Sequence, residues 1–217
     1  SPPPDGISAA WLARNDLTPL QRATDNFIRS LAGYCVATFV LGIGDRHNDN
    51  IMITKDGHFL HIDFGHFLGN FKSKFGIRRE RTELVLTKAM VEVFGGEKGP
   101  KWGEFISLAQ RAFLILRKNA ALLITCFTLM ISCGIPELSA MKDIDYLRNK
   151  LMLSLSEEDA SKVLEKTFLS SLHSAASHAS LLFPRAVLFS FSVTLLRYSL
   201  FIIFKRSLPF CLSGTAA

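Results

Sequence analysis

Apolar residues recur at helical intervals along much of this 217-residue chain. Phe27, Leu31, Cys35 and Phe39 follow one another at steps of four, which places them on one face of a helix. Just before them, residues 18–21 read Thr-Pro-Leu-Gln, the form of a capping box with proline at the first helical position. The pattern therefore predicts a helix that begins at this segment and buries a single apolar stripe.

A second apolar segment runs from about Phe105 to Cys133 and stops at the Gly-Ile-Pro of residues 134–136, which terminates a helix well. Asn119 is a candidate break that would divide this segment into two helices. Ser139 and Ser156 are candidate N-caps for two further helices, the second of which opens with acidic residues at its positive end. We expect a mainly helical body.

Two short runs rich in strand-forming residues, 51–54 and 59–62, flank an Asp-Gly pair at residues 56 and 57, and this arrangement predicts a β-hairpin. With a two-residue turn, the antiparallel register places Asn50 opposite Asp63. An amide oxygen and a carboxylate would then converge on one point, and such hard oxygen ligands suit a divalent cation such as Mg²⁺. The predicted fold class is α+β, a mainly helical lobe that carries one small β-hairpin.

The composition bears on both partners and fold. The net charge of +6 favours anionic partners, and the 48% of apolar residues are enough to form a buried core. The cysteines, which show neither paired spacing nor metal-ligand clustering, are expected to be buried thiols in a reducing compartment. The Pro-rich start does not resemble a signal peptide. The sequence shows no zinc spacing and no nucleic-acid motif. The four cysteines are Cys35, Cys126, Cys133 and Cys211.

The end of the chain differs in composition from the rest. Residues 169–217 are rich in Ser, Leu and Phe, are poor in acidic residues and contain the apolar run Leu181–Phe204. That run is long enough to cross a bilayer, but Pro184, Arg185 and Arg197 interrupt it, and a surface-lying amphipathic segment is an alternative. We interpret this tail as an alternative or aberrant exon end.

Two polar motifs carry the candidate chemistry: Gly-Ile-Gly-Asp-Arg-His-Asn-Asp-Asn at residues 42–50 and His-Ile-Asp-Phe-Gly-His at residues 61–66. They supply the carboxylates, amides and imidazoles that hold cations and guide a proton in phosphoryl transfer. They resemble the catalytic and metal-binding loops of phosphoinositide 3-kinases, in which the His-Arg-Asp order of protein kinases is reversed to Asp-Arg-His, as at residues 45–47. Residues 65–81 are similar to the activation loop of class I enzymes, of the gamma or delta type.

The resemblance implies a role for individual residues. His47 is similar to the catalytic histidine of the family, and an imidazole suits this work because it titrates near neutral pH. His66 is similar to a second histidine near the transferred phosphate. A purely local hydrogen bond is the alternative for both, and it is the preferred interpretation for His58 and His61. The implied catalytic residues are Asp45, Arg46, His47 and His66, and the implied metal ligands are Asn50 and Asp63.

Met52 and Ile62, together with Asp63, match family positions that receive ATP, where apolar side chains line the adenine pocket. With Asn50 opposite Asp63, however, Met52 and Ile62 would point to opposite faces of the hairpin. Either a bulged turn shifts the pairing by one residue or one of the assignments is wrong. Ordinary core packing of both side chains is the alternative.

A basic loop follows the second motif, and by resemblance it selects head groups with phosphates at the 4 and 5 positions, which cations attract. A solvated charge run without a partner is the alternative. The family sequence Arg-Val-Pro-Phe is replaced by Arg-Thr-Glu-Leu at residues 81–84, which we expect to loosen the end of the loop. The candidate substrate-binding residues are Lys72, Lys74, Arg78, Arg79 and Arg81.

The resemblance divides the chain into a flexible segment (1–17), the C-terminal lobe of a catalytic domain (18–168) and the divergent tail (169–217). No glycine-rich phosphate loop or strand lysine precedes residue 42, so we expect an incomplete ATP site and an inactive isolated lobe. The implied activity is transfer of the γ-phosphate of ATP, with Mg²⁺, to the 3-hydroxyl of phosphoinositides such as phosphatidylinositol 4,5-bisphosphate. A non-catalytic lipid- or partner-binding fragment and a serine/threonine kinase lobe are the alternatives. The expected partners are phosphoinositide head groups and a regulatory subunit, without nucleic acid, and the expected location is the cytoplasm, with recruitment to the inner face of the plasma membrane.

Overall fold

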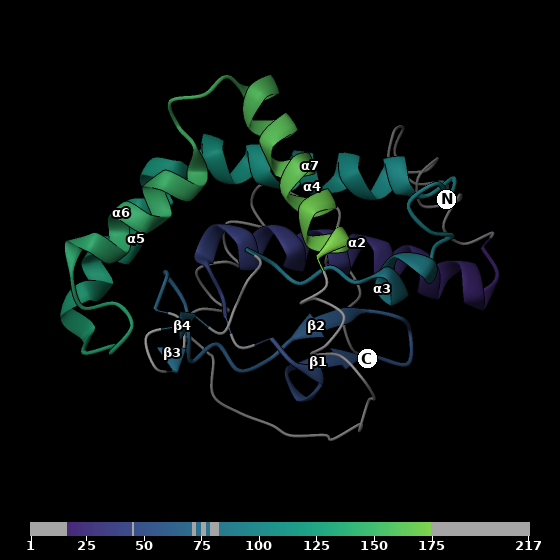
Figure 1. Ribbon diagram of the computed structural model, residues 1–217, viewed down its shortest axis with the longest axis horizontal. Helices are drawn as coiled ribbons and strands as arrows, with labels where there is room; N and C mark the ends of the chain where they lie inside the picture. Colours follow the sequence, from purple (N-terminus) through teal and green to yellow (C-terminus); the bar gives the residue numbers. More distant parts are fainter. Residues whose placement is uncertain (1–16, 45, 71–72, 75–76, 79–82, 175–217) are drawn as a thin grey trace, which may run out of the picture.

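The computed structural model describes residues 17–44, 46–70, 73–74, 77–78 and 83–174. These residues form a helical body with a small hairpin, β1 (Ile51–Ile53) and β2 (Phe59–His61), against one side, which confirms the predicted fold class (Figure 1). A second two-stranded pairing joins β3 (Ser73–Lys74) and β4 (Ile77–Arg78). The expected flexible segment 1–17, except its last residue, and the tail from residue 175 onward lie outside the described residues.

The central helix is α2 (Pro19–Leu41), and it begins where the sequence predicts. Thr18 and Gln21 form the capping box, in which each side chain accepts a hydrogen bond from the backbone N–H of the other residue. The predicted stripe at positions 27, 31, 35 and 39 is buried throughout. Burial raises the pKa of the Cys35 thiol, so this cysteine behaves as an apolar core residue.

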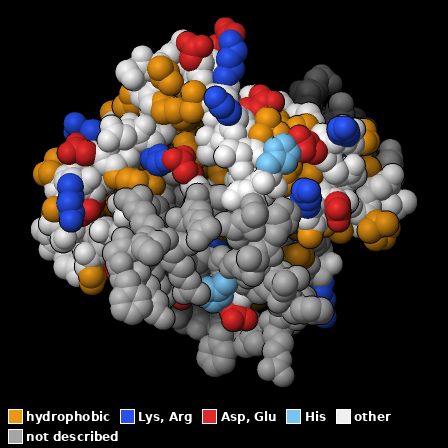
Figure 2. Space-filling view, in the orientation of Figure 1, with side chains coloured by type: hydrophobic (Ala, Val, Ile, Leu, Met, Phe, Trp, Pro, Cys, Tyr) orange, Lys and Arg blue, Asp and Glu red, His pale blue; other side chains and the backbone are white. Residues whose placement is uncertain are grey.

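The helix Trp102–Lys118 covers α2 on the side away from the hairpin (Figure 1). α4 (Trp102–Lys118) packs against α2 and against α7 (Glu157–His173), and α5 (Ala120–Met130) packs against α6 (Met141–Leu151). The short helix α3 (Lys88–Glu92) leads into α4. Figure 2 shows acidic and basic side chains intermixed over the helical part of one face. The rings of Phe94, Trp102 and Phe168 surround Phe105, which is fully buried.

The apolar segment between residues 102 and 133 divides at Asn119, as predicted. The Asn119 side chain donates to the carbonyl of Ile115 at 2.8 Å, which satisfies one of the last carbonyls of α4. A 3₁₀ turn, η2 (Ile131–Cys133), then ends at Gly134 in the left-handed conformation. Within the described residues no single helix is long and apolar enough to cross a membrane, although α4 and residues 120–133 reach that threshold as a pair bent by 67°.

The two predicted N-caps have different outcomes. Ser156 caps α7, because its Oγ accepts from the N–H of Asp159 at 3.0 Å. Ser139 is not the cap of α6, which starts one residue later with Ala140 in the cap position. Instead, the Asp143 carboxylate reaches back and accepts from the N–H groups of Ser139 and Ala140, both at 3.0 Å. A buried acid inside the first turn therefore replaces the predicted serine.

The hairpin has a register that differs by one residue from the prediction based on a two-residue turn. Met52 pairs with Leu60 and Ile51 with His61, so Asn50 lies opposite Ile62 and not opposite Asp63. The N–H of Thr54 donates to the carbonyl of His58 at 2.9 Å, so the turn between these two residues has three residues, 55–57. In it the N–H of Gly57 donates to the carbonyl of Thr54 at 3.0 Å, and Gly57 has φ +90°. A turn of this kind ends in a glycine bulge, which shifts the pairing. The bulged alternative is therefore confirmed.

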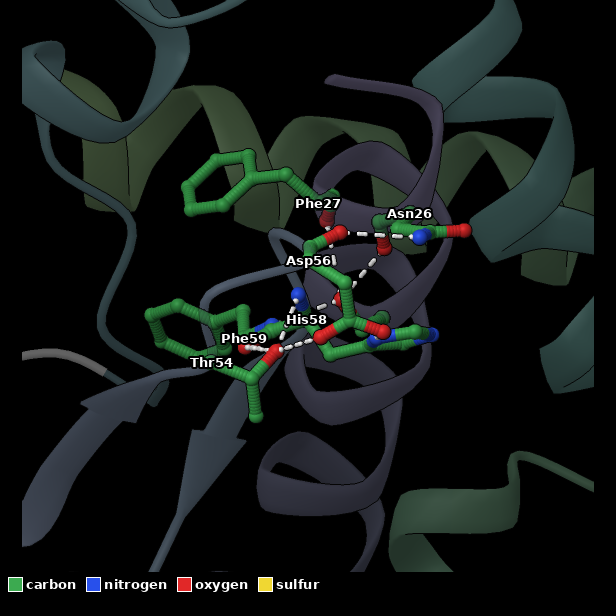
Figure 3. Close-up of polar contacts among 7 residues, drawn as sticks. Asn26, Phe27, Thr54, Asp56, His58 and Phe59 are labelled. Carbon is green, nitrogen blue, oxygen red and sulfur yellow. Dashed lines mark hydrogen bonds and ion pairs between the residues drawn. The ribbon is translucent and has the colours of Figure 1, made fainter. Parts of the chain in front are cut away.

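The hairpin tip is fixed on α2 by polar contacts (Figure 3). Asn26 Nδ2 donates to the carbonyl of Asp56 at 2.9 Å, and the N–H of Phe59 donates to Ser30 Oγ at 2.8 Å. A Cβ at Gly57 would lie 2.2 Å from the carbonyl oxygen of Ala23, so only glycine fits this approach. The fit of the tip against α2 therefore selects the three-residue turn.

From residue 83 onward the end of the basic loop is anchored on the helical body, while residues 81 and 82 lie outside the described residues, so the expected loosening at residues 81–84 stays a prediction. Leu84 and Leu86 are buried, and Ser171 of α7 lies between their backbones. Its Oγ donates to the carbonyl of Leu84 at 2.6 Å and accepts from the N–H of Leu86 at 3.3 Å. Glu83 pairs with Lys150 of α6 at 2.8 Å. Leucine at position 84 thus supplies the apolar anchor within the described part of the loop.

Ser171→Ala is expected to lower the free energy of unfolding by about 1–3 kcal/mol, because it leaves two buried backbone groups without their partner. Urea unfolding measures the change. Ser161→Ala is the matched control, since among the described residues the Ser161 hydroxyl bonds only within α7, to the carbonyl of Glu157. Equal losses for the two variants would contradict the anchoring role of Ser171.

Candidate active site

The first polar motif begins where α2 ends, and backbone hydrogen bonds tie it to the second. Gly42 adopts the left-handed conformation (φ +55°) and stops the helix. The N–H of Gly44 then donates to the carbonyl of His66 at 2.9 Å, and the N–H of Leu68 donates to the carbonyl of Leu41 at 2.7 Å. The two motifs, separate in sequence, therefore meet along one line of main-chain contacts.

Arg46 is the side chain that joins the two motifs. Only 6% of it is exposed, and its guanidinium donates to the carbonyls of Gly44 (2.8 Å), Ile62 (2.6 Å) and Asp63. It also lies over the ring of Phe64, 5.7 Å from the centroid. Arginine suits this position because its rigid fork of donors satisfies several acceptors at once. Arg46 thus acts on the site by holding the loops that carry the other residues.

His47 and Asn50 form a pair within the first motif. Asn50 Nδ2 and His47 Nε2 are 3.2 Å apart, and the turn η1 (Asn48–Asn50) holds them so that the N–H of Asn50 donates to the carbonyl of His47 at 2.9 Å. An amide nitrogen can only donate, so Nε2 accepts and the neutral imidazole carries its proton on Nδ1. Nδ1 faces the Asp49 carboxylate at 3.8 Å. Oδ1 of the buried Asn50 is then the atom of this amide that can coordinate a cation.

Asp63 lies at the same end of the hairpin as Asn50. The N–H of Ile62, its chain neighbour, donates to the carbonyl of Asn50 at 3.0 Å. Asp63 is exposed, and its backbone adopts the left-handed conformation (φ +57°). Its Oδ1 accepts a hydrogen bond from the N–H of Gly65 at 3.2 Å. A left-handed conformation is uncommon for residues other than glycine and costs energy that functional sites often retain.

The donor set fits magnesium better than a metal that needs a cage of protein ligands. The described residues contain no group of three or more His, Cys, Asp or Glu side chains that could hold a metal ion. One amide oxygen and one carboxylate leave several coordination positions open, and Mg²⁺ in phosphoryl-transfer sites fills such positions with water and substrate phosphates. Asn50 and Asp63 supply donor atoms that suit this ion, but their meeting at one cation was predicted from a register that the structure does not adopt, and it stays a prediction.

The shifted register removes the conflict over Met52 and Ile62. Since Met52 pairs with Leu60, and Leu60 and Ile62 are two apart on one strand, all three lie on the same face of the hairpin. All three are half-buried, whereas Phe59 and His61 on the other face are buried against α2. The first face offers the apolar surface that an adenine ring requires.

His66 is oriented by its own loop. Its Nδ1 lies 3.3 Å from the carbonyl oxygen of Asn70, and a carbonyl can only accept, so Nδ1 carries the proton. Its backbone carbonyl is the acceptor for Gly44 described above. The side chain is half-buried.

The other two hairpin histidines have local partners, which agrees with the interpretation preferred for them. His58 pairs with Asp56 at the hairpin tip, Nδ1 to Oδ2, at 2.9 Å (Figure 3). His61 is 3% exposed and packs edge-on against Tyr34 and Phe59. Burial, with the nearby Arg46 charge, lowers the pKa of His61 from 6.5 to about 3, so this imidazole is neutral. Its Nδ1 has no hydrogen-bond partner within the described residues.

We expect the stability of the protein to fall as the pH falls from 6.5 toward 3, and His61 to contribute to that fall. The unfolded chain binds a proton at this position near pH 6.5, while the folded chain does so only near pH 3. Stability therefore rises with pH in this window, by up to about 1.4 kcal/mol per pH unit for one proton. Urea unfolding at several pH values should show a smaller slope for His61→Gln than for the matched tip variant His58→Gln. Identical slopes would contradict the buried neutral imidazole.

Several candidate residues cannot be placed. Asp45 lies outside the described residues, as do Lys72, Arg79 and Arg81. Only the backbone of Lys74 and Arg78 is described, in β3 and β4, which pair antiparallel. The roles assigned to these residues stay predictions.

Sequence reasoning missed the support that α6 gives to both motifs. Gly42 and Gly69 approach the Tyr146 ring so closely that a Cβ would lie 2.4 Å and 2.8 Å from its nearest atoms. Asn70 Nδ2 lies 3.5 Å from Oδ1 of the buried Asp143. The sequence features that could have indicated these contacts are the two glycines and Asp143, an acid in the first turn of a helix. None of these features identifies the residue that it contacts.

The chain is similar in sequence to known phosphatidylinositol kinases. A family model described as "Phosphatidylinositol 3- and 4-kinase" matches residues 1–140. The chain is 50% identical over 154 residues to "Phosphatidylinositol 3-kinase 1" of Dictyostelium discoideum, a match that covers 70% of this chain and 10% of the relative. It is 51% identical over 160 residues to "Phosphatidylinositol 3-kinase 3" of the same organism, covering 73% and 9%. "Phosphatidylinositol 3-kinase 2" is 49% identical over 158 residues, covering 72% and 8%. The matches thus span about a tenth of the length of these relatives.

Proposed function

Because the chain belongs to the phosphatidylinositol 3- and 4-kinase family, we propose that it forms the lobe of a phosphatidylinositol 3-kinase that carries the catalytic and metal-binding residues. The proposed reaction moves the γ-phosphate of ATP to the 3-hydroxyl of a phosphoinositide such as phosphatidylinositol 4,5-bisphosphate. The observation that carries the proposal is the junction of the two motifs, where Arg46 bonds the carbonyls of Ile62 and Asp63 while Asn50 bonds His47.

The proposed roles follow from this junction. Asn50 and Asp63 hold Mg²⁺, which neutralises charge on the phosphates when bound. Met52 and Ile62 receive the adenine ring on the half-buried face of the hairpin. His47 lies one hydrogen bond from a proposed metal ligand, so its imidazole is placed to stabilise charge beside the attacking hydroxyl, and it can accept the proton of that hydroxyl only when Nε2 releases Asn50 Nδ2. His66, on the other motif, is joined to the first motif by its backbone carbonyl, which accepts from the N–H of Gly44.

The basic loop is the proposed contact for the lipid head group. Five cations between residues 72 and 81 favour a polyanionic head group, each by about 1 kcal/mol near an anionic surface. The Ser171 and Glu83 contacts fix the end of this loop on α7 and α6. Recruitment from the cytoplasm to the inner face of the plasma membrane, and a regulatory subunit in the whole enzyme, belong to the same proposal.

The function can be tested in a chimaeric enzyme, called the chimaera below. In it, the matching part of Dictyostelium phosphatidylinositol 3-kinase 1 is replaced by the residues of this chain. With γ-labelled ATP and vesicles that contain phosphatidylinositol 4,5-bisphosphate, the label should appear on the inositol 3-position. Neutralising the five loop cations should lower turnover of this lipid more than turnover of unphosphorylated phosphatidylinositol. Vesicle binding without turnover would support a non-catalytic fragment instead, and labelling of protein hydroxyls would support a serine/threonine kinase.

A further inference from the structure

Helix α6 packs against the backbone of both motif-bearing loops. The Tyr146 ring contacts the backbone at Gly42, where the first motif begins, and at Gly69, where the second loop turns. Both glycines have positive φ, at +55° and +81°. No other residue could adopt that conformation and leave room for the ring. The relative position of the two loops therefore depends on α6, a helix that contributes no residue to the proposed chemistry.

Asn70 is the polar link between α6 and the second loop. Its Nδ2 donates to the carbonyl of Glu137 at 2.7 Å and lies 3.3 Å from the carbonyl of Phe67 and 3.5 Å from Asp143 Oδ1. Oδ2 of Asp143, which is 3% exposed, is fixed in turn by the two N–H groups that precede α6. Every acceptor around the amide nitrogen is an oxygen, so the orientation of the Asn70 amide is determined.

The backbone of Asn70 carries this orientation to the imidazole of His66. The Asn70 carbonyl oxygen lies 3.3 Å from His66 Nδ1, and the carbonyl of His66 accepts from the N–H of Gly44. The histidine is thus held at its ring by one residue and at its backbone by another. A hydrogen bond at one ring nitrogen decides which tautomer a neutral imidazole adopts, and hence which nitrogen is left as an acceptor.

We propose that Asn70 is a positioning residue for His66: with its amide fixed by Glu137 and Asp143 of the α6 region, it aims its carbonyl at Nδ1, so that Nε2 is the acceptor nitrogen. His47 differs, because its Nε2 is the nitrogen bonded to Asn50. The consequence for catalysis rests on the proposed function, whereas the tautomer is a property of this chain alone.

The tautomer can be read from the ¹⁵N chemical shifts of the His66 ring in this chain at about pH 8, where an ordinary imidazole is neutral. The wild-type spectrum should show the Nδ1–H form as the main species. Asn70→Ala should reduce that form, because the freed loop no longer fixes the carbonyl. Asn119→Ala is the matched control, since it also removes an asparagine amide that bonds a backbone carbonyl, here at the junction of α4 and α5, and it should leave the His66 shifts unchanged.

A wild-type spectrum dominated by the Nε2–H form would overturn the proposal, and so would unchanged His66 shifts in a folded Asn70→Ala protein. The wild-type spectrum decides the geometry even where the variant fails to fold. In the chimaera, Asn70→Ala should lower kcat about 10-fold, the size of effect that orienting residues outside the first layer of a site have, with little change in KM for ATP. An inactive chimaera would count against the proposed function and leave the tautomer result standing.

Discussion

Asp63→Asn is expected to lower kcat of the chimaera about 10³-fold, a loss typical of removing one charge-stabilising group from a reaction centre. Asparagine is the same size as aspartate, so its side-chain oxygen can still accept from the N–H of Gly65. Asparagine also tolerates the left-handed conformation of position 63 better than most residues. The fold is therefore preserved while a charged metal ligand becomes a neutral one.

Asp56→Asn is the matched control for this change. Asp56 is an exposed carboxylate on the same hairpin, where it pairs with His58 at the opposite end from Asn50. Its substitution should leave kcat unchanged. Lipid kinase activity that survives Asp63→Asn, measured beside an active Asp56→Asn enzyme, would show that the carboxylate at position 63 does not carry the reaction.

Arg46→Lys is expected to lower the free energy of unfolding by about 3 kcal/mol, because lysine cannot bond all of the carbonyls that the guanidinium bonds now. Those acceptors are buried or half-buried, and they belong to both motifs. Arg46→Ala should cost more than Arg46→Lys, because alanine also removes the cation from above the Phe64 ring. Urea unfolding of this chain measures both.

Arg29→Lys provides the comparison for Arg46, since Arg29 forms an ion pair with Asp25 four residues earlier on the same helix and is more exposed. An i, i+4 ion pair on a helix contributes about 0.3–0.5 kcal/mol, and lysine at position 29 can keep one charged contact with the buried Asp25 carboxylate. If Arg46→Lys costs no more than Arg29→Lys, the view that Arg46 joins the motifs is wrong.

Much of the helical body could be predicted from sequence because its signals are local. The capping box at Thr18 and Gln21 and the stripe on α2 depend on residues within a few turns of one another. The division at Asn119 and the cap at Ser156 are local in the same way. Such signals need no knowledge of the tertiary structure, and these predictions are confirmed.

The register of the hairpin could not be fixed from sequence, because it depends on a long-range contact. An Asp-Gly pair is compatible with a two-residue turn and with a three-residue turn that ends in glycine. The choice between them depends on the fit of Gly57 against Ala23 of α2 and on the bond from Asn26. A shift of one residue then decides which side chains share a face, including Met52 and Ile62.

The support from α6 was also beyond sequence reasoning. Asn70 and Asp143 are separated by 73 positions, and a single side-chain contact leaves no periodic pattern. The same holds for Ser171 and the end of the basic loop, which are 85 or more positions apart. The anchoring of the two buried leucines, Leu84 and Leu86, could not be seen in advance, because its partner lies on a distant helix.

The central claim is that Asn50 and Asp63 hold one divalent cation at the junction of the two motifs. The direct test is titration of this chain with Mn²⁺ and ATP, in which the paramagnetic ion broadens NMR signals of nearby nuclei. The account predicts that the signals of Asn50 and Asp63 broaden first, that excess Mg²⁺ restores them, and that Asp63→Asn abolishes the effect at Asn50. Broadening confined to other carboxylates, with Asn50 and Asp63 unaffected, would contradict it.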